Sequence, residues 1–207
     1  MTANAITLFR LFLTFTVIAI FRRHPYIDIA CIITILIIFI LDSVDGIVAR
    51  KHNQTSKFGA VFDIAADRIV ENVFWIYFAF IIDFIPYWMP IVVVTRGILT
   101  DGIRGFALTD GKTPFEMMSA AWTRALTSSR FSRGLYGLAK TLVFIFLPIV
   151  DLLSPENTTL NISFINTTVI DTFSLVSVII AYVAVAMCLI RGFPVLIDGW
   201  QYIKRSS

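Results

Sequence analysis

The chain has 207 residues, of which 57% are hydrophobic and only 15% are charged, and its mean hydropathy is +0.83. These values exclude an ordinary soluble domain and predict an integral membrane protein that lies in a lipid bilayer. The net charge is only +3, and we expect no nucleic-acid partner.

Six segments are hydrophobic enough to be interpreted as membrane spans, each of which needs about 20 mostly apolar residues. In chain order they are residues 4–22, 26–50, 57–82, 86–108, 134–151 and 169–191. The first contains Arg10 and lacks a small-residue cleavage pattern, so we expect it to be retained and not removed as a signal peptide. The sequence therefore predicts an all-α integral membrane protein with six transmembrane helices in a single domain, residues 1–207.

The positions of lysine and arginine predict the orientation of these spans, because basic residues accumulate on the cytoplasmic side. With a cytoplasmic N-terminus, the basic residues on that side are Arg50, Lys51, Lys57, Lys112, Arg124, Arg130, Arg133, Arg191, Lys204 and Arg205. Arg22 and Arg23 then lie on the outer side. We therefore expect a multi-pass protein with both termini on the cytoplasmic side.

The second and third spans carry four aspartates on either side of the connection KHNQTSK. One helical stripe contains Asp42, Asp45, Gly46, Ala49 and Arg50, and a second stripe contains Asp63 and Asp67. The short connection lets the two helices run antiparallel, so the four carboxylates are predicted to converge near the cytoplasmic edge of the bilayer.

Carboxylates gathered in a membrane protein need compensating cations, because like charges at short range in a low dielectric repel strongly. Mg²⁺ prefers oxygen ligands, commonly bridges carboxylates to phosphates, and in pairs holds attacking and leaving oxygens together. The aspartates therefore predict phosphate chemistry on the cytoplasmic side. Gly46, Ala49 and Gly59 would leave room for a bulky ligand, and Arg50 would pair with a phosphate oxygen. Close helix packing and inner-edge charge explain these four residues equally well, but they do not explain the acids.

Two later segments lie outside the predicted spans. Residues 111–132 combine apolar and basic residues in a pattern typical of a helix at the cytoplasmic interface. Residues 152–168 form a polar outer loop with three N-x-S/T patterns, and the sequence leaves their glycosylation open.

The aspartate region resembles a known family. The pattern Asp42-x2-Asp45-Gly46-x2-Ala49-Arg50-x8-Gly59-x3-Asp63-x3-Asp67 is similar to the complete signature of the CDP-alcohol phosphatidyltransferases. The resemblance implies transfer of a phosphatidyl group from CDP-diacylglycerol, or a related CDP-linked lipid, to an alcohol with release of CMP. It implies that the four aspartates bind Mg²⁺ or Mn²⁺, which we expect as two ions, and that Asp67 is also the general base. The implied donor-binding residues are Gly46, Ala49, Arg50, Ser56 and Gly59.

Other stretches resemble the phosphatidylglycerophosphate synthases within that family. These stretches are NAITLFRLFLT, VTRGILTDGIRGF with Arg96 and Arg104, and Gly137-x2-Lys140-Thr141. Gly97 and Leu138 stand where that group has an acid and a lysine, so the acceptor is less securely implied than the donor. We expect sn-glycerol 3-phosphate, with its phosphate bound by some subset of Arg96, Arg104, Arg133 and Lys140. Positive-inside bias is an alternative explanation that readily accounts for Arg133 and can extend to Arg104. It accounts less well for Arg96, which lies deeper in its span.

Several alternatives stay open. The same chemistry could use inositol phosphate, serine or an archaeal-type lipid donor, and the sequence is compatible with a homodimer. A divalent-cation transporter is the alternative of another class, in which the aspartates bind an ion in transit. It leaves the Gly, Ala and Arg spacing unexplained, and it places the acids toward one face instead of at the midplane.

Overall fold

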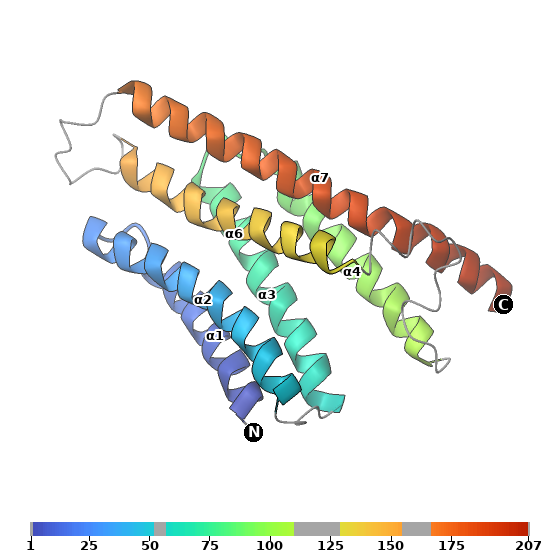
Figure 1. The fold of residues 1–207 in the computed structure, drawn as a ribbon. Helices are drawn as coiled ribbons and strands as arrows, with labels where there is room; N and C mark the ends of the chain where they lie inside the picture. The colour runs from blue at the N-terminus through green and yellow to red at the C-terminus, as the bar shows by residue number, and fades with distance from the viewer. Residues whose placement is uncertain (1, 52–56, 110–128, 155–166, 207) are drawn as a thin grey trace. The chain divides into compact units, whose positions relative to one another are not determined.

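A computed structural model of the protein describes residues 2–51, 57–109, 129–154 and 167–206. These residues form the helices α1 (Thr2–Ile20), α2 (Pro25–Lys51), α3 (Lys57–Ile81), α4 (Trp88–Thr109), α6 (Arg130–Leu153) and α7 (Thr167–Ser206) (Figure 1). No strand occurs in the described ranges. The prediction of an all-α membrane protein is therefore confirmed, with one helix for each of the six predicted spans.

Three of the described stretches are long and apolar enough to cross a membrane by length and composition, namely Pro25–Asp42, Phe131–Leu153 and Thr167–Trp200. Asn4–Ile20 is apolar but shorter. Charged residues interrupt the apolar character of the other helices: α3 carries Asp63, Asp67, Arg68 and Glu71, and α4 carries Arg96, Asp101 and Arg104. Of these charged residues, Asp63, Asp67, Arg96 and Arg104 are the ones from which the sequence predicts chemistry.

The chain divides into two compact units. Unit 1 consists of Met1–Ile85 and Thr141–Val178, and unit 2 consists of Pro86–Lys140 and Ile179–Ser207. Helices α6 and α7 therefore each contribute one part to unit 1 and the other part to unit 2.

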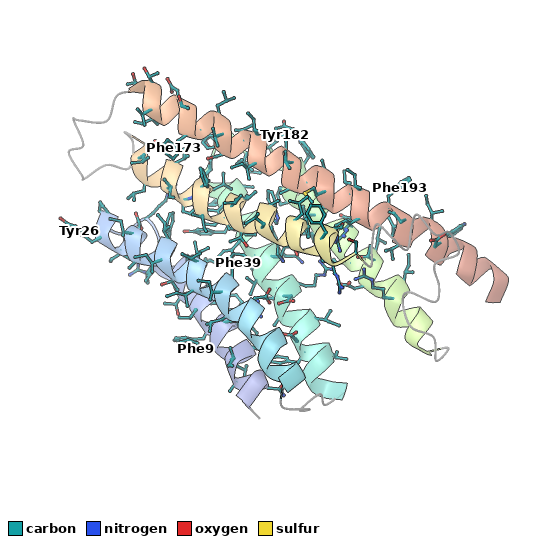
Figure 2. The ribbon with its side chains drawn as sticks, viewed as in Figure 1. Phe9, Tyr26, Phe39, Phe173, Tyr182 and Phe193 are labelled. Atoms are coloured by element: carbon teal, nitrogen blue, oxygen red, sulfur yellow. The ribbon has the colours of Figure 1, made fainter. Side chains whose placement is uncertain are left out.

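Aromatic side chains form the core of unit 1. The ring centroid of Phe144 lies 5.7 Å from that of Phe39, 5.5 Å from that of Phe74 and 5.5 Å from that of Trp75. Figure 2 shows Phe39 directed toward its neighbouring helices, whereas Phe9 projects away from α1. Burial of aromatic area holds these helices together, while the outward apolar side chains suit contact with lipid.

Arg22 joins three segments at one end of unit 1. It lies in the turn after α1 with a φ of 66°, and its backbone N–H donates to a carboxylate oxygen of Asp28 at 2.7 Å. Its guanidinium forms a bidentate ion pair with Asp151 of α6, in which Nε donates to Oδ2 at 3.0 Å and Nη2 donates to Oδ1. Nη2 also donates to the Ile81 carbonyl at 2.9 Å. Both acids are buried, and through these contacts Arg22 connects α2, α3 and α6.

Helix α7 extends 15 residues beyond the predicted end of its span at residue 191, since it ends at Ser206. Gly192 and Pro194 suggest a stop in the sequence, but inside a helix they are tolerated where packing compensates. In unit 2, a Cβ on Gly192 would lie 2.5 Å from Arg96 Nε, and one on Gly199 would lie 2.2 Å from Ile103 Cγ2. These glycines let α7 pack closely on α4 within unit 2, so the helix continues.

Two other expectations fall largely on residues that the structure leaves undescribed. Of the interfacial helix predicted at residues 111–132, residues 111–128 lie outside the described ranges, and Arg130–Ser132 form the first turn of α6. The outer loop predicted at residues 152–168 is shorter at both ends, because α6 continues to Leu153 and α7 begins at Thr167; its residues 155–166 are outside the described ranges.

Candidate active site

Arg10 of α1 is the central residue of the predicted acidic site. Helix α1 packs against both α2 and α3, and the Arg10 side chain is only 2% exposed. Its Nη2 lies 2.7 Å from Asp42 Oδ1 and 2.9 Å from Asp67 Oδ1, and its Nη1 lies 3.9 Å from Asp63 Oδ1. The structure thus brings three of the four predicted aspartates, from two helices, to one guanidinium.

The three aspartates keep access to solvent on their other side. Their side chains are 32%, 46% and 39% exposed for Asp42, Asp63 and Asp67, in contrast to the nearly complete burial of Arg10. The arginine therefore approaches the carboxylates from inside unit 1, and the open side of the cluster faces outward. Among the side chains that the structure describes here, three carboxylates face one guanidinium, an arrangement that further cations can compensate.

The donor chemistry of this cluster fits a hard divalent cation, because all of its ligands are carboxylate oxygens. Oδ1 of Asp63 is buried and accepts no hydrogen bond from the described residues. A buried oxygen of this kind needs a partner, and a metal ion would supply one. Asp45 belongs to α2, but its side chain is outside the described part of the structure. Among the described residues, no group of three or more acids, histidines or cysteines is arranged closely enough to hold a metal ion.

The predicted donor-binding residues remain untested. Gly46, Ala49 and Arg50 lie in the last turns of α2, where the side chains are not described, and Ser56 lies outside the described ranges. Gly59 lies in the first turn of α3, in the same helix as Asp63 and four residues before it.

Sequence reasoning missed the role of Arg10. That reasoning used Arg10 only as evidence that the first span is retained and as part of the stretch NAITLFRLFLT. A signal was available, because an arginine in the middle of an apolar helix needs a carboxylate or ligand partner. The partners themselves were not identifiable, since Asp67 lies 57 positions away along the chain.

Unit 2 contains a separate group of cations around Tyr136 of α6, which we call the Tyr136 cluster: Arg96, Tyr136, Lys140 and Arg191. The Tyr136 ring centroid lies 6.0 Å from Arg96 Cζ, 5.8 Å from Lys140 Nζ and 5.9 Å from Arg191 Cζ. The negative face of an aromatic ring attracts cations at such distances, which offsets part of their mutual repulsion.

Buried donors in the Tyr136 cluster favour an anion. Nη1 of Arg191 donates to Ser132 Oγ at 2.7 Å. The Nε–H groups of Arg96 and Arg191 are buried and have no hydrogen-bond partner within the described ranges. Leaving such donors unsatisfied is costly, and arginine N–H groups form strong charge-assisted hydrogen bonds with phosphate or carboxylate oxygens.

The structure divides the four predicted acceptor residues into two pairs. Arg96 and Lys140 lie in the Tyr136 cluster. Arg104 instead lies 3.7 Å from Asp101 on its own helix, and Arg133 is exposed. Arg191 is the member that sequence reasoning missed, although it is the first charge after the charge-free run 172–190. In the sequence, positive-inside bias is a sufficient explanation for Arg191, and only the structure places Arg191 beside Tyr136.

Comparison with known proteins decides the family. The family model for CDP-alcohol phosphatidyltransferases matches residues 1–190. The chain belongs to this family. No curated protein and no solved structure gives a significant match. The predicted family resemblance is confirmed, and this phosphatidyltransferase accordingly acts in phospholipid synthesis by transferring a phosphatidyl group from a CDP-alcohol. The family is generally dependent on divalent metal ions, which agrees with the oxygen-only donor set around Arg10.

Proposed function

We propose that the protein transfers the phosphatidyl group of CDP-diacylglycerol to sn-glycerol 3-phosphate, giving phosphatidylglycerophosphate and CMP. The family supports the transfer itself. The observation that carries the acceptor is the Tyr136 cluster, in which Arg96 and Arg191 present buried Nε–H groups without a hydrogen-bond partner in the described residues. An acceptor with its own phosphate would satisfy those donors and neutralise the cations.

The proposed metal ligands are Asp42, Asp45, Asp63 and Asp67, holding two Mg²⁺ or Mn²⁺ ions. Such ions, when bound, neutralise pyrophosphate charge and favour the departure of CMP. The convergence of three of these acids on Arg10 supports this assignment, as does the buried Oδ1 of Asp63.

Asp67 is the proposed general base. As the acceptor hydroxyl oxygen bonds to the phosphatidyl phosphorus, its proton passes to Asp67, and the bond from that phosphorus to the CMP oxygen breaks with the electron pair leaving on CMP. Oδ1 of Asp67 accepts from Arg10, which holds the carboxylate in place. An aspartate is a weak base at its usual pKa of about 3.9, and proton transfer therefore accompanies attack and does not precede it.

The rest of the chain would bind the donor and the acceptor phosphate. Arg50 is proposed to pair with a phosphate of CDP-diacylglycerol, with Gly46, Ala49, Ser56 and Gly59 in the same donor site. Arg96, Lys140 and Arg191 are proposed to bind the acceptor phosphate, with Arg104 and Arg133 as more distant charges.

We further propose one membrane domain with its termini and active site on the cytoplasmic side. The family model, which extends from residue 1 to residue 190, supports a single functional domain. The distribution of lysine and arginine supports the orientation.

The test is CMP release by the purified protein in detergent micelles with CDP-diacylglycerol, Mg²⁺ and a panel of acceptors. We expect sn-glycerol 3-phosphate to support release and unphosphorylated glycerol to fail, because glycerol leaves the buried N–H donors unpaired. Preference for inositol phosphate would keep the phosphate site and change the acceptor. Reaction with serine or free inositol alone would contradict the phosphate site, and absence of CMP release with every acceptor would contradict the transferase.

A further inference from the structure

Arg10 holds the acidic cluster together from its buried side. A single nitrogen, Nη2, contacts Asp42 of α2 at 2.7 Å and Asp67 of α3 at 2.9 Å. These two carboxylates belong to different helices, and without a cation between them they would repel each other. The guanidinium is therefore the cation that brings α2 and α3 together at this point.

We propose that Arg10 is an internal counter-cation that competes with divalent metal ions for the charge of the aspartate cluster. It keeps the cluster assembled before metal binds, and each bound metal ion weakens its hold. The proposal rests on the metal site of the proposed function.

Electrostatics gives the coupling its sign. The guanidinium and a divalent ion are both positive and both compensate the charge of Asp42, Asp63 and Asp67, so each lowers the benefit of the other. Such coupling is reciprocal. If a bound metal ion weakens the contacts of Arg10 with the aspartates, then Arg10 must weaken metal binding by the same free energy. Removing the positive charge of Arg10 should destabilise the metal-free protein and should tighten metal binding.

Two other roles for Arg10 predict different results. An arginine that only joined α1 to α2 and α3 would stabilise the protein equally with and without metal, so metal affinity would not change on substitution. An arginine that oriented the carboxylates for the metal would support binding, and its removal would weaken metal affinity, as loss of outer ligand partners generally does. Metal affinity after substitution therefore separates the three roles by sign.

The experiment measures thermal unfolding of the full chain in detergent, first with EDTA and then over a range of free Mn²⁺ or Mg²⁺. The dependence of Tm on free metal gives the dissociation constant. For Arg10→Gln we expect a lower Tm in EDTA, a larger rise of Tm on adding metal, and a dissociation constant about tenfold lower than that of the wild type, within the usual range of coupling between sites. Arg10→Lys keeps the charge and should bind metal about as the wild type does.

Arg22→Gln is the matched control. Arg22 also binds buried carboxylate in unit 1, but its partner is Asp151 and not a proposed metal ligand. This variant should lose stability equally in EDTA and in metal, with an unchanged dissociation constant.

An unchanged or higher dissociation constant in Arg10→Gln, or no response of its Tm to metal, would overturn the proposal. A variant that folds only with Mn²⁺ and unfolds when EDTA is added would support it. Failure to fold under both conditions, while Arg22→Gln folds, would overturn it, because the role would then be structural. If Arg10→Gln binds metal more tightly but the wild type releases no CMP with any acceptor, the result would contradict the proposed function alone.

Discussion

Unit 1 contains two arginine–aspartate clusters of opposite design. At one end, Arg22 pairs with Asp151, which is 5% exposed, and donates its remaining hydrogen bonds to Asp28 and to a backbone carbonyl. In the other cluster, Arg10 is 2% exposed and its three aspartates are between 32% and 46% exposed. The first buries its acids and closes a helix end, whereas the second buries its cation and exposes its acids.

The difference separates a structural ion pair from a binding site. A buried pair is stable only when its hydrogen bonds are satisfied, and in the Arg22 cluster the guanidinium binds Asp151 and a backbone carbonyl while Asp28 accepts a backbone N–H. Within the described residues, the Arg10 cluster sets three carboxylates against one guanidinium, and Oδ1 of Asp63 accepts no hydrogen bond. Carboxylates gathered in this way destabilise a protein unless a ligand uses them, so they indicate function.

The largest expected effect is on the acids around Arg10. Asp42→Asn and Asp63→Asn remove charge at nearly constant volume, and we expect each to lower Mg²⁺-dependent CMP release by about 100-fold or more, because loss of even an outer partner of a metal ligand costs about 10–100-fold. Thermal unfolding in EDTA should show little loss of stability for Asp63→Asn, which relieves repulsion, and a larger loss for Asp42→Asn, which also removes the charge paired with Arg10 at 2.7 Å. Activity within twofold of the wild type at limiting Mg²⁺, in both variants, would contradict the metal site.

Asp151→Asn should have the opposite profile. It removes the carboxylate that binds the Arg22 guanidinium and leaves that charge without its partner. Breaking a fully buried pair costs about 3–5 kcal/mol, but Arg22 is 37% exposed, so we expect about 2 kcal/mol and a Tm about 4–8 °C lower. CMP release per folded molecule should not change. If Asp151→Asn instead lost activity and kept its full stability, the Arg22 cluster would not be purely structural.

The two clusters also show what the sequence could predict. The helices and the acidic stripes followed from local patterns, because apolar runs and i, i+3 and i+4 spacings are visible in one dimension. The pairing of Arg10 with Asp42 and Asp67 depends on how α1 packs on two other helices, which no local spacing encodes. The sixth predicted span ends at residue 191, whereas α7 continues to Ser206, and the close packing of Gly192 on Arg96 in that extension is likewise invisible in the local pattern.

A smaller effect is expected when the comparison is extended to the Tyr136 cluster of unit 2. There the buried Nε–H groups of Arg96 and Arg191 have no hydrogen-bond partner among the described residues, so an anionic ligand is the expected partner. Arg191→Gln should raise the KM for sn-glycerol 3-phosphate about tenfold, since a hydrogen bond to a charged group contributes about 1.5–3 kcal/mol, and should leave the KM for CDP-diacylglycerol unchanged. Arg23→Gln, at an exposed arginine of the α1–α2 turn, is the control and should match the wild type. An equal rise in both KM values would contradict an acceptor-specific role.

The smallest effect is expected from Gly192→Ala, which tests the position of Arg96 without changing any charge. The added Cβ would lie 2.5 Å from Arg96 Nε and 2.6 Å from its Cγ, so the flexible arginine side chain must shift. We expect the KM for sn-glycerol 3-phosphate to rise about two- to fivefold, because off-rotamer adjustment of one side chain costs about 0.5–1.5 kcal/mol. Gly134→Ala in α6 is the matched control, since a Cβ there has nothing within 4 Å and the helix itself favours alanine. If both variants keep the wild-type KM, the placement of Arg96 beside Tyr136 does not matter for the acceptor; if only Gly192→Ala changes it, a steric shift of this one arginine is sufficient to weaken acceptor binding.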